Sequence, residues 1–355
     1  MAERVYFRGL DGLRAIAASG VMVSHVLSAL HHFHGHAHHA GLELANQSVV
    51  VFFTLSGFLI TFLLLRERDQ LGDIDLRAFY VRRILRIWPL YFFYIALAMT
   101  CHALFDPQGV PNASYVILFI CFIPNIAFNL NRYMPDTGPL WSIGIEEQFY
   151  ALWPLVVRHV RKLSRLLVAV IVCVLGARVA MHVAHGGGKH LAVSVLDSIG
   201  YDSMAIGALF AIAYRRAMPT LLRVARSPFV AVVFLGWIAL LATNQLYVLS
   251  LAVTPTTSAL TGLFILNQID DRKKLVDLEQ PGIRYLGRIS FGIYVYNPLM
   301  VSLLVWITGD RRIPAFGLVL LVSAMTIAVA SLSYRFLEKP FLRLKDRFAH
   351  IKTTA

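Results

Sequence analysis

Long runs of apolar residues constrain this chain more than any other feature of its sequence. Residues 49–65, 289–307 and 315–332 carry few or no charges, and each run is about as long as a helix needs to be to cross the hydrocarbon core of a bilayer. Hydrophobic residues make up 57% of the chain and charged residues only 15%, which excludes a soluble globule. A membrane β-barrel would show short alternating segments instead. The sequence therefore predicts an all-α, polytopic helical bundle in a membrane.

The distribution of basic residues predicts the topology of this bundle. Lys and Arg number 33 against 20 Asp and Glu, and in a membrane protein such an excess lies in cytoplasmic loops, so it does not indicate nucleic-acid binding. All basic clusters fall on one side only if either 114–130 or 145–158 fails to cross. Because 114–130 contains Pro124 and several Asn residues, we expect that segment to be re-entrant. The prediction is about ten transmembrane helices plus one re-entrant segment.

We expect both termini to be cytoplasmic and the protein to be integral to the bacterial inner membrane. Residues 1–345 are predicted to form a single transmembrane domain, and 346–355 a short cytoplasmic tail. No metal site is expected. The three cysteines lie in apolar runs without the spacing of metal ligands, and the histidine-rich stretch 31–39 is an external loop that imposes no ligand geometry.

Two ionisable residues share a face of the first predicted span. Arg14 and His25 are eleven residues apart, which places them within about 20° of the same helix face and about 16 Å apart along the axis. Ionisable residues inside a span are costly and are candidates for function. An interfacial arginine and a hydrogen-bonded structural histidine would show the same spacing, so spacing alone leaves both interpretations open.

An arginine cluster opens the third predicted span. Arg82, Arg83 and Arg86 stand in RRILRIWPLY, where a helix would present several guanidinium forks to a polyanion such as a nucleotide phosphate. The alternative is a basic cluster that only fixes the orientation of the span.

Two acidic residues stand in the motif LWSIGIEEQFY. One of Glu146 and Glu147 could hold the ring of His25 and stabilise its protonated form, as carboxylates do for other general bases. The alternative is a pair of acids that is favourable near a helix N-terminus.

Taken together and in order, six motifs resemble the membrane-bound acyltransferase family 3, whose members transfer acyl groups to hydroxyls of glycans, lipids and natural products. The motifs are GLDGLRAIAA at 9–18, FFTLSGFLI at 52–60, RRILRIWPLY at 82–91, LWSIGIEEQFY at 140–150, ISFGIYVYNPL at 289–299 and SYRFLEKP at 333–340.

This resemblance implies roles for named residues. His25 would be catalytic with Glu146, and the residues expected to bind the donor are Arg14, Ser56, Arg82, Arg83 and Arg86. The substrate-side motif residues would be Trp141, Ser142, Glu147, Gln148, Tyr150, Tyr334 and Glu338.

The chain departs from the family pattern at two positions. Asn297 stands where members often carry His, and it cannot titrate near neutrality. Gly200 and Tyr201 precede Asp202, where members often carry an Arg two residues before the carboxylate. Arg178 in the preceding span is expected to pair with Asp202 inside the bundle.

The resemblance implies an O-acyltransferase that uses cytoplasmic acyl-CoA, in particular acetyl-CoA, as a co-substrate. The acceptor would be a hydroxyl of a saccharide or of a saccharide-bearing lipid, with His25 as general base. An acyl-histidine intermediate is the alternative route. Two rivals remain at this point: a proton-coupled transporter or flippase for an envelope glycan precursor, and a structural subunit of an envelope complex.

Overall fold

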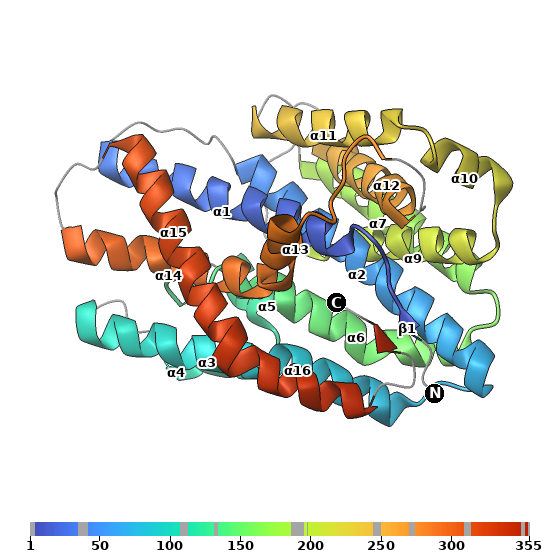
Figure 1. Cartoon of the computed structure of the whole chain (residues 1–355), viewed down its shortest axis with the longest axis horizontal. Coiled ribbons are helices and arrows are strands. Elements are labelled where there is room, and N and C mark those ends of the chain that lie inside the picture. Colours follow the sequence, from blue (N-terminus) through green and yellow to red (C-terminus); the bar gives the residue numbers. More distant parts are fainter. Residues whose placement is uncertain are drawn as a thin grey trace.

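The fold is a bundle of helices, most of which run along the long axis of the molecule (Figure 1). The computed structural model describes residues 4–34, 42–106, 113–130, 134–185, 195–196, 198–243, 250–269, 274–308, 314–348 and 352–353. This architecture confirms the predicted all-α membrane fold class. The helices are α1 Leu10–His34, α2 Leu42–Leu71, α3 Leu76–Phe105, α4 Ala113–Ile120, α5 Pro124–Asn129, α6 Leu140–His159, α7 Leu163–His185, α9 Tyr201–Arg215, α10 Pro219–Ala225, α11 Phe229–Ala242, α12 Ser250–Ile269, α13 Pro281–Arg288, α14 Ser290–Thr308, α15 Ala315–Ser333, the π-helical turn η3 Tyr334–Glu338, α16 Lys339–Lys345 and the 3-10 turn η4 Asp346–Phe348.

The number of membrane-spanning helices is lower than predicted. Within the described residues, six helices are long and apolar enough to cross a membrane, or up to seven if the bent pair α10 and α11 forms one span, against the ten expected. Two predicted spans are short as helices, since α9 has 15 residues and α11 has 14. In a third predicted span, α6, polar residues near the start lower the mean hydropathy of the helix. Apolar sequence therefore overestimated the number of full-length spans.

The segment 114–130 is broken into two short helices. The chain turns at Phe122, which has a positive φ of 57°, and the flanking helices α4 and α5 have only eight and six residues. Neither is long enough to cross a bilayer by itself. Gln148 of α6 holds this break, because its Nε2 donates to the Phe122 carbonyl at 2.9 Å and to Asn125 Oδ1 at 3.0 Å. Whether the segment re-enters the membrane stays a prediction.

Helix α6 is longer than the sequence indicated. It begins at Leu140 rather than near 145, and its 20 residues extend about 30 Å, which matches the hydrocarbon thickness. The bounds 145–158 expected from the sequence were therefore too narrow, because the motif before Glu146 is already helical.

Helix α2 lies at the centre of the bundle and makes its closest approach to α9. A Cβ atom on Gly57 would lie 2.0 Å from the Met204 carbonyl oxygen, and one on Gly207 would lie 2.0 Å from that of Thr54. Small residues let helix backbones approach each other in membranes, where packing rather than water exclusion drives association. On its other side α2 packs against α1, which also packs against α13, α14 and α15. Helix α1 is thus held between α2 and α14.

A buried ion pair joins α7 to α9. Arg178 Nη1 donates to Asp202 Oδ2 at 2.5 Å and Arg178 Nη2 to Oδ1 at 3.2 Å, and Asp202 has no exposed surface. This is the pairing predicted from the sequence. The bidentate geometry offsets the cost of burying both charges.

The two ends of the chain meet in a short parallel ladder. Strand β1, Arg4–Val5, pairs with β2, Lys352–Thr353, in the register Arg4 to Lys352. Residues of the predicted tail therefore lie beside the N-terminus (Figure 1). The expected division at residue 345 stays a prediction.

Candidate functional site

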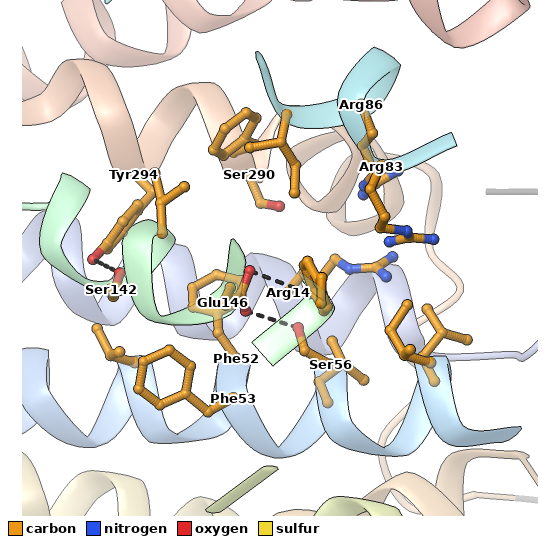
Figure 2. Close-up of a pocket in the computed structure, with 18 residues that line it drawn as sticks. Arg14, Phe52, Phe53, Ser56, Arg83, Arg86, Ser142, Glu146, Ser290 and Tyr294 are labelled. Carbon is orange, nitrogen blue, oxygen red and sulfur yellow. Dashed lines mark hydrogen bonds between the residues drawn. The ribbon is translucent and has the colours of Figure 1, made fainter. Parts of the chain in front are cut away.

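A cavity of about 110 Å³ lies between α1, α2, α3, α6 and α14 (Figure 2). It brings together residues from five of the six sequence motifs, although they are up to 280 positions apart in the chain. The residues predicted from the sequence that line it are Arg14, Ser56, Arg83, Arg86, Ser142, Glu146 and Tyr150; Ser290 and Tyr294 join them from α14.

The cavity is cationic at one end. Figure 2 shows Arg14, Arg83 and Arg86 gathered on one side of Glu146, with Ser142 and Tyr294 on the other. Arg14 comes from the first turns of α1, and its Nη1 donates to Asp11 Oδ1 at 2.9 Å. The two other arginines come from α3, three residues apart, so they project from neighbouring positions of one helix.

The two arginines of α3 lack carboxylate partners. Within the described part of the chain, neither Arg83 nor Arg86 has an acidic oxygen at ion-pair distance. Arg83 lies over the rings of Phe79 and Tyr150, with its Cζ 5.7 and 5.5 Å from the ring centroids, and its buried Nε has no hydrogen-bond partner. Cations that are partly withdrawn from water and have no partner are costly. This end of the cavity is therefore suited to an anion.

Arg82 is separated from the other two arginines. Its Nη2 donates to Glu67 Oε2 at 3.0 Å, its Nη1 donates to the Phe348 carbonyl at 2.8 Å, and it does not line the cavity. The sequence grouped it with Arg83 and Arg86 as a donor-binding residue. In the structure Arg82 joins α2, α3 and η4 outside the cavity, and its role in donor binding stays a prediction.

Sequence reasoning missed one further cation. Lys345, at the end of α16, is largely buried and close enough to Arg14, Arg83 and Arg86 for the four charges to interact. Its nearest acidic atom is Asp346 Oδ1 at 3.9 Å from Nζ. No motif marked Lys345, because α16 reaches α3 only through the tertiary fold.

Glu146 occupies the middle of the cavity. Ser56 Oγ donates to its Oε1 at 2.8 Å, and Tyr150 OH donates to its Oε2 at 3.3 Å. One interpretation of the sequence was that Glu146 or Glu147 holds the ring of His25. In the structure both oxygens of Glu146 bond to other residues, and the Nδ1 of His25 bonds to Asn297.

His25 is oriented by an asparagine. Its Nδ1 lies 3.0 Å from Asn297 Oδ1, and Asn297 Nδ2 donates to Thr326 Oγ1 at 3.3 Å. An amide oxygen can only accept, so Nδ1 carries a proton, and in the neutral ring Nε2 then has the lone pair. Asn297 is fully buried, and its bond to Thr326 fixes which way the amide points. Sequence reasoning treated Asn297 only as a departure, because 272 residues separate it from His25.

His25 lies just beyond the aromatic end of the cavity. Ser142 and Tyr294 line that end, and their hydroxyl oxygens are 2.6 Å apart. Asn297 follows Tyr294 by three residues on α14, which is about 4.5 Å along the helix axis. His25 therefore lies beyond the cavity in the direction of the α14 axis, and it lies beyond Arg14 along the axis of α1.

The remaining motif residues of α6 hold the surrounding helices. Trp141 stacks on Phe128 of α5 with ring centroids 6.0 Å apart. Glu147 Oε2 accepts a hydrogen bond from Trp88 Nε1 of α3 at 2.9 Å. Together with the hydrogen bonds of Gln148 to the break at Phe122, these contacts fix the position of α6, the helix that carries Glu146.

Tyr334 and Glu338 begin and end the π-helical turn η3. The Lys339 N–H donates to the carbonyl of Tyr334, five residues back, and the next residue is Pro340, which has no N–H to donate. Glu338 is buried, and Ser333 Oγ donates to its Oε1 at 3.4 Å. The turn packs against α3, the helix of the arginine cluster.

Within the described residues no group of three or more His, Cys, Asp or Glu side chains could hold a metal ion. The side chains of the histidine-rich stretch 31–39 lie outside the described part, so the expectation for that loop stays a prediction.

Comparisons with known proteins point to acyl transfer. A family model described as an acyltransferase domain matches residues 7–335. "Putative O-acetyltransferase SACOL0978" of Staphylococcus aureus strain COL is 26% identical over 363 residues, covering 95% of this chain and 57% of that protein. O-acetyltransferase OatA of S. aureus strain NCTC 8325 is 25% identical over 372 residues, covering 94% of this chain and 57% of the relative. The chain thus spans a little over half the length of these curated relatives. No solved structure matches it significantly.

Proposed function

The chain belongs to the acyltransferase family whose model matches residues 7–335, and on this premise we propose that it moves an acetyl group from acyl-CoA to a hydroxyl of a saccharide or saccharide-linked lipid. The single observation that carries the proposal is a cationic end, in which Arg83 and Arg86 have no carboxylate partner in the described part of the chain, in line with an oriented histidine along the axis of α1. The names of the relatives, O-acetyltransferases, support acetyl as the transferred group.

The cationic end would bind the phosphates of the donor. Arg83 and Arg86 have no carboxylate partner in the described part of the chain, and their planar forks match phosphate oxygens. Arg14 and His25 are about 16 Å apart along the axis of α1, a distance similar to the length of a pantetheine arm. With its phosphates at the arginines, the donor would present its thioester at His25.

His25 would act as the general base. Its Nε2 takes the proton of the acceptor hydroxyl while the hydroxyl oxygen attacks the thioester carbonyl carbon. The carbon–sulfur bond breaks, the thiolate leaves, and the proton held on Nε2 passes to the sulfur. Asn297 keeps the proton on Nδ1 throughout, so Nε2 is the atom that accepts and returns it. In the alternative route Nε2 attacks the thioester and forms an acyl-histidine intermediate.

The orientation in the membrane follows from the same proposal. The arginine end of the cavity lies at the end of the bundle where α2 ends among basic residues. We place this end of the bundle on the cytoplasmic side of a bacterial inner membrane, and we place both termini on the same side. Acyl-CoA would then enter from the cytoplasm.

The test is mass spectrometry of surface glycans and lipids from cells that lack the gene and are complemented by the wild-type chain or by His25→Ala. We expect the wild type to restore one acetyl unit per modified residue and His25→Ala to restore none at equal expression. An unchanged acetyl content with altered export of the glycan would reject the proposal in favour of a transporter. Restoration by His25→Ala would remove His25 from the chemistry.

A further inference from the structure

A second basic cavity lies at the end of the bundle where α2 and α9 finish, on the right of Figure 1. It has a volume of about 160 Å³ and lies between the end of α2, the start of α7 and the end of α9. Arg68 follows Ser56 by twelve residues on α2, which is about 18 Å along that helix. The second cavity is therefore separate from the donor cavity.

Four arginines and one acid line this second cavity. The acid, Asp69, is paired with Arg215, and Arg68 Nη1 donates to the Val157 carbonyl at 2.8 Å. The other two, Arg161 and Arg216, are exposed and have no ion-pair partner in the described part of the chain. The excess of positive charge and the free guanidinium forks fit a phosphate group.

The floor of the cavity is apolar. Leu65, Leu163 and Ile212 lie under the arginines, each less than a tenth exposed. A site with a charged rim and an apolar floor suits an amphiphile better than a free ion.

Helix α7 supplies a path for acyl chains from the same place. Only 11% of the residues in its apolar window are buried, so the helix faces outward over most of its length. Val168, Val172, Val179 and Val183 are each about half or more exposed and recur at helical spacing on one face. Ser164, which lines the cavity, precedes Val168 by four residues on α7 and so lies on the same face, and Arg161 stands in the turn just before the helix begins.

We propose that this second cavity binds the headgroup of an anionic phospholipid, with the phosphate at Arg161 and Arg216 and the acyl chains along the exposed face of α7. Basic pockets between helix ends recognise anionic headgroups at the cytoplasmic leaflet, where anionic lipids are present. The site requires no catalysis, and it stands whether or not the donor cavity binds acyl-CoA.

Native mass spectrometry of the full chain in detergent tests the proposal, with dioleoylphosphatidylglycerol as probe and dioleoylphosphatidylcholine as zwitterionic control. We expect the wild type to bind the first lipid more tightly than the second. Each of Arg161→Gln and Arg216→Gln should weaken phosphatidylglycerol binding about fivefold, and the double variant about 25-fold. Phosphatidylcholine binding should not change.

The matched control is the double variant Arg343→Gln with Arg347→Gln, which removes the same charge from exposed arginines of α16 and η4. An equal loss of phosphatidylglycerol binding in this control would overturn the proposal in favour of nonspecific charge. A third probe, sn-glycerol 3-phosphate, has the phosphate without the chains. If it displaces phosphatidylglycerol at comparable concentration, the site binds a soluble phosphate and the lipid assignment fails.

Discussion

The two ends of the donor cavity differ in how their polar groups are satisfied. At the arginine end, Arg83 and Arg86 are partly buried and have no carboxylate partners in the described part of the chain. At the histidine end, side chains are bonded to one another, His25 to Asn297 and Asn297 to Thr326. The first arrangement leaves interaction energy for a ligand, whereas the second fixes one atom in one orientation. The difference indicates that one end binds and the other end reacts.

The largest effect is expected at the histidine end. His25→Ala should lower the rate of acetyl transfer by about 10²–10⁴, because the general base is lost. The affinity for coenzyme A should stay within twofold of the wild type, since the arginines are untouched. The measurement is single-turnover transfer together with coenzyme A titration by calorimetry on the purified chain. Loss of both properties would show that the two ends are not separate.

The opposite result is expected at the arginine end. Arg86→Gln should weaken binding of coenzyme A by about 10- to 100-fold, because a charge-assisted hydrogen bond contributes roughly 1.5–3 kcal/mol. The rate at saturating donor should change little. Arg223→Gln, in the last turn of α10, removes the same charge outside the cavity and serves as the control. Equal affinities in the two variants would reduce the cluster to a topology signal.

The orientation of His25 can be tested separately from its presence. Asn297→Leu removes the acceptor for Nδ1–H and should lower the transfer rate by about tenfold, the value of one hydrogen bond. Asn297→Asp keeps an acceptor and should retain most of the rate. Its carboxylate favours the protonated imidazole, so the acidic limb of the pH–rate profile should move to higher pH. A profile that does not move, with equal rates in both variants, would leave Asn297 a packing residue only.

The sequence predicted those features that depend on local spacing. The helical fold class follows from the apolar runs, the shared face of Arg14 and His25 from helical periodicity, and the Arg178 pairing from the cost of charge in a membrane. The sequence predicted that 114–130 does not cross the membrane, because Pro124 and the Asn residues disfavour a continuous span, and the two short helices found there are consistent with this prediction.

Features that depend on distant contacts were not predictable in the same way. The predicted number of spans was wrong because apolar composition does not give the length of a helix, as the 14 residues of α11 show. The Asn297 acceptor lies 272 residues from His25, and no spacing rule joins positions on two helices that only the tertiary fold brings together. The position of Lys345 near the arginines could not be predicted for the same reason, since only the packing of α16 on α3 brings it there.

The smallest effect is expected for Arg82, which tests whether position in the fold or membership of a motif decides donor binding. Arg82→Gln alone would leave Glu67, only 3% exposed, as a buried charge without its cation, so a loss of thermal stability is expected. The double variant Glu67→Gln with Arg82→Gln removes both charges and should recover much of that stability. Its affinity for coenzyme A should stay within about twofold of the wild type, because Arg82 does not line the cavity and its charge is balanced by Glu67 in the native chain. Calorimetric titration of the double variant beside Arg86→Gln measures the contrast. If the double variant loses affinity as strongly as Arg86→Gln, all three arginines act as one anion site, and the separation of Arg82 from the cationic end of the cavity carries no functional meaning.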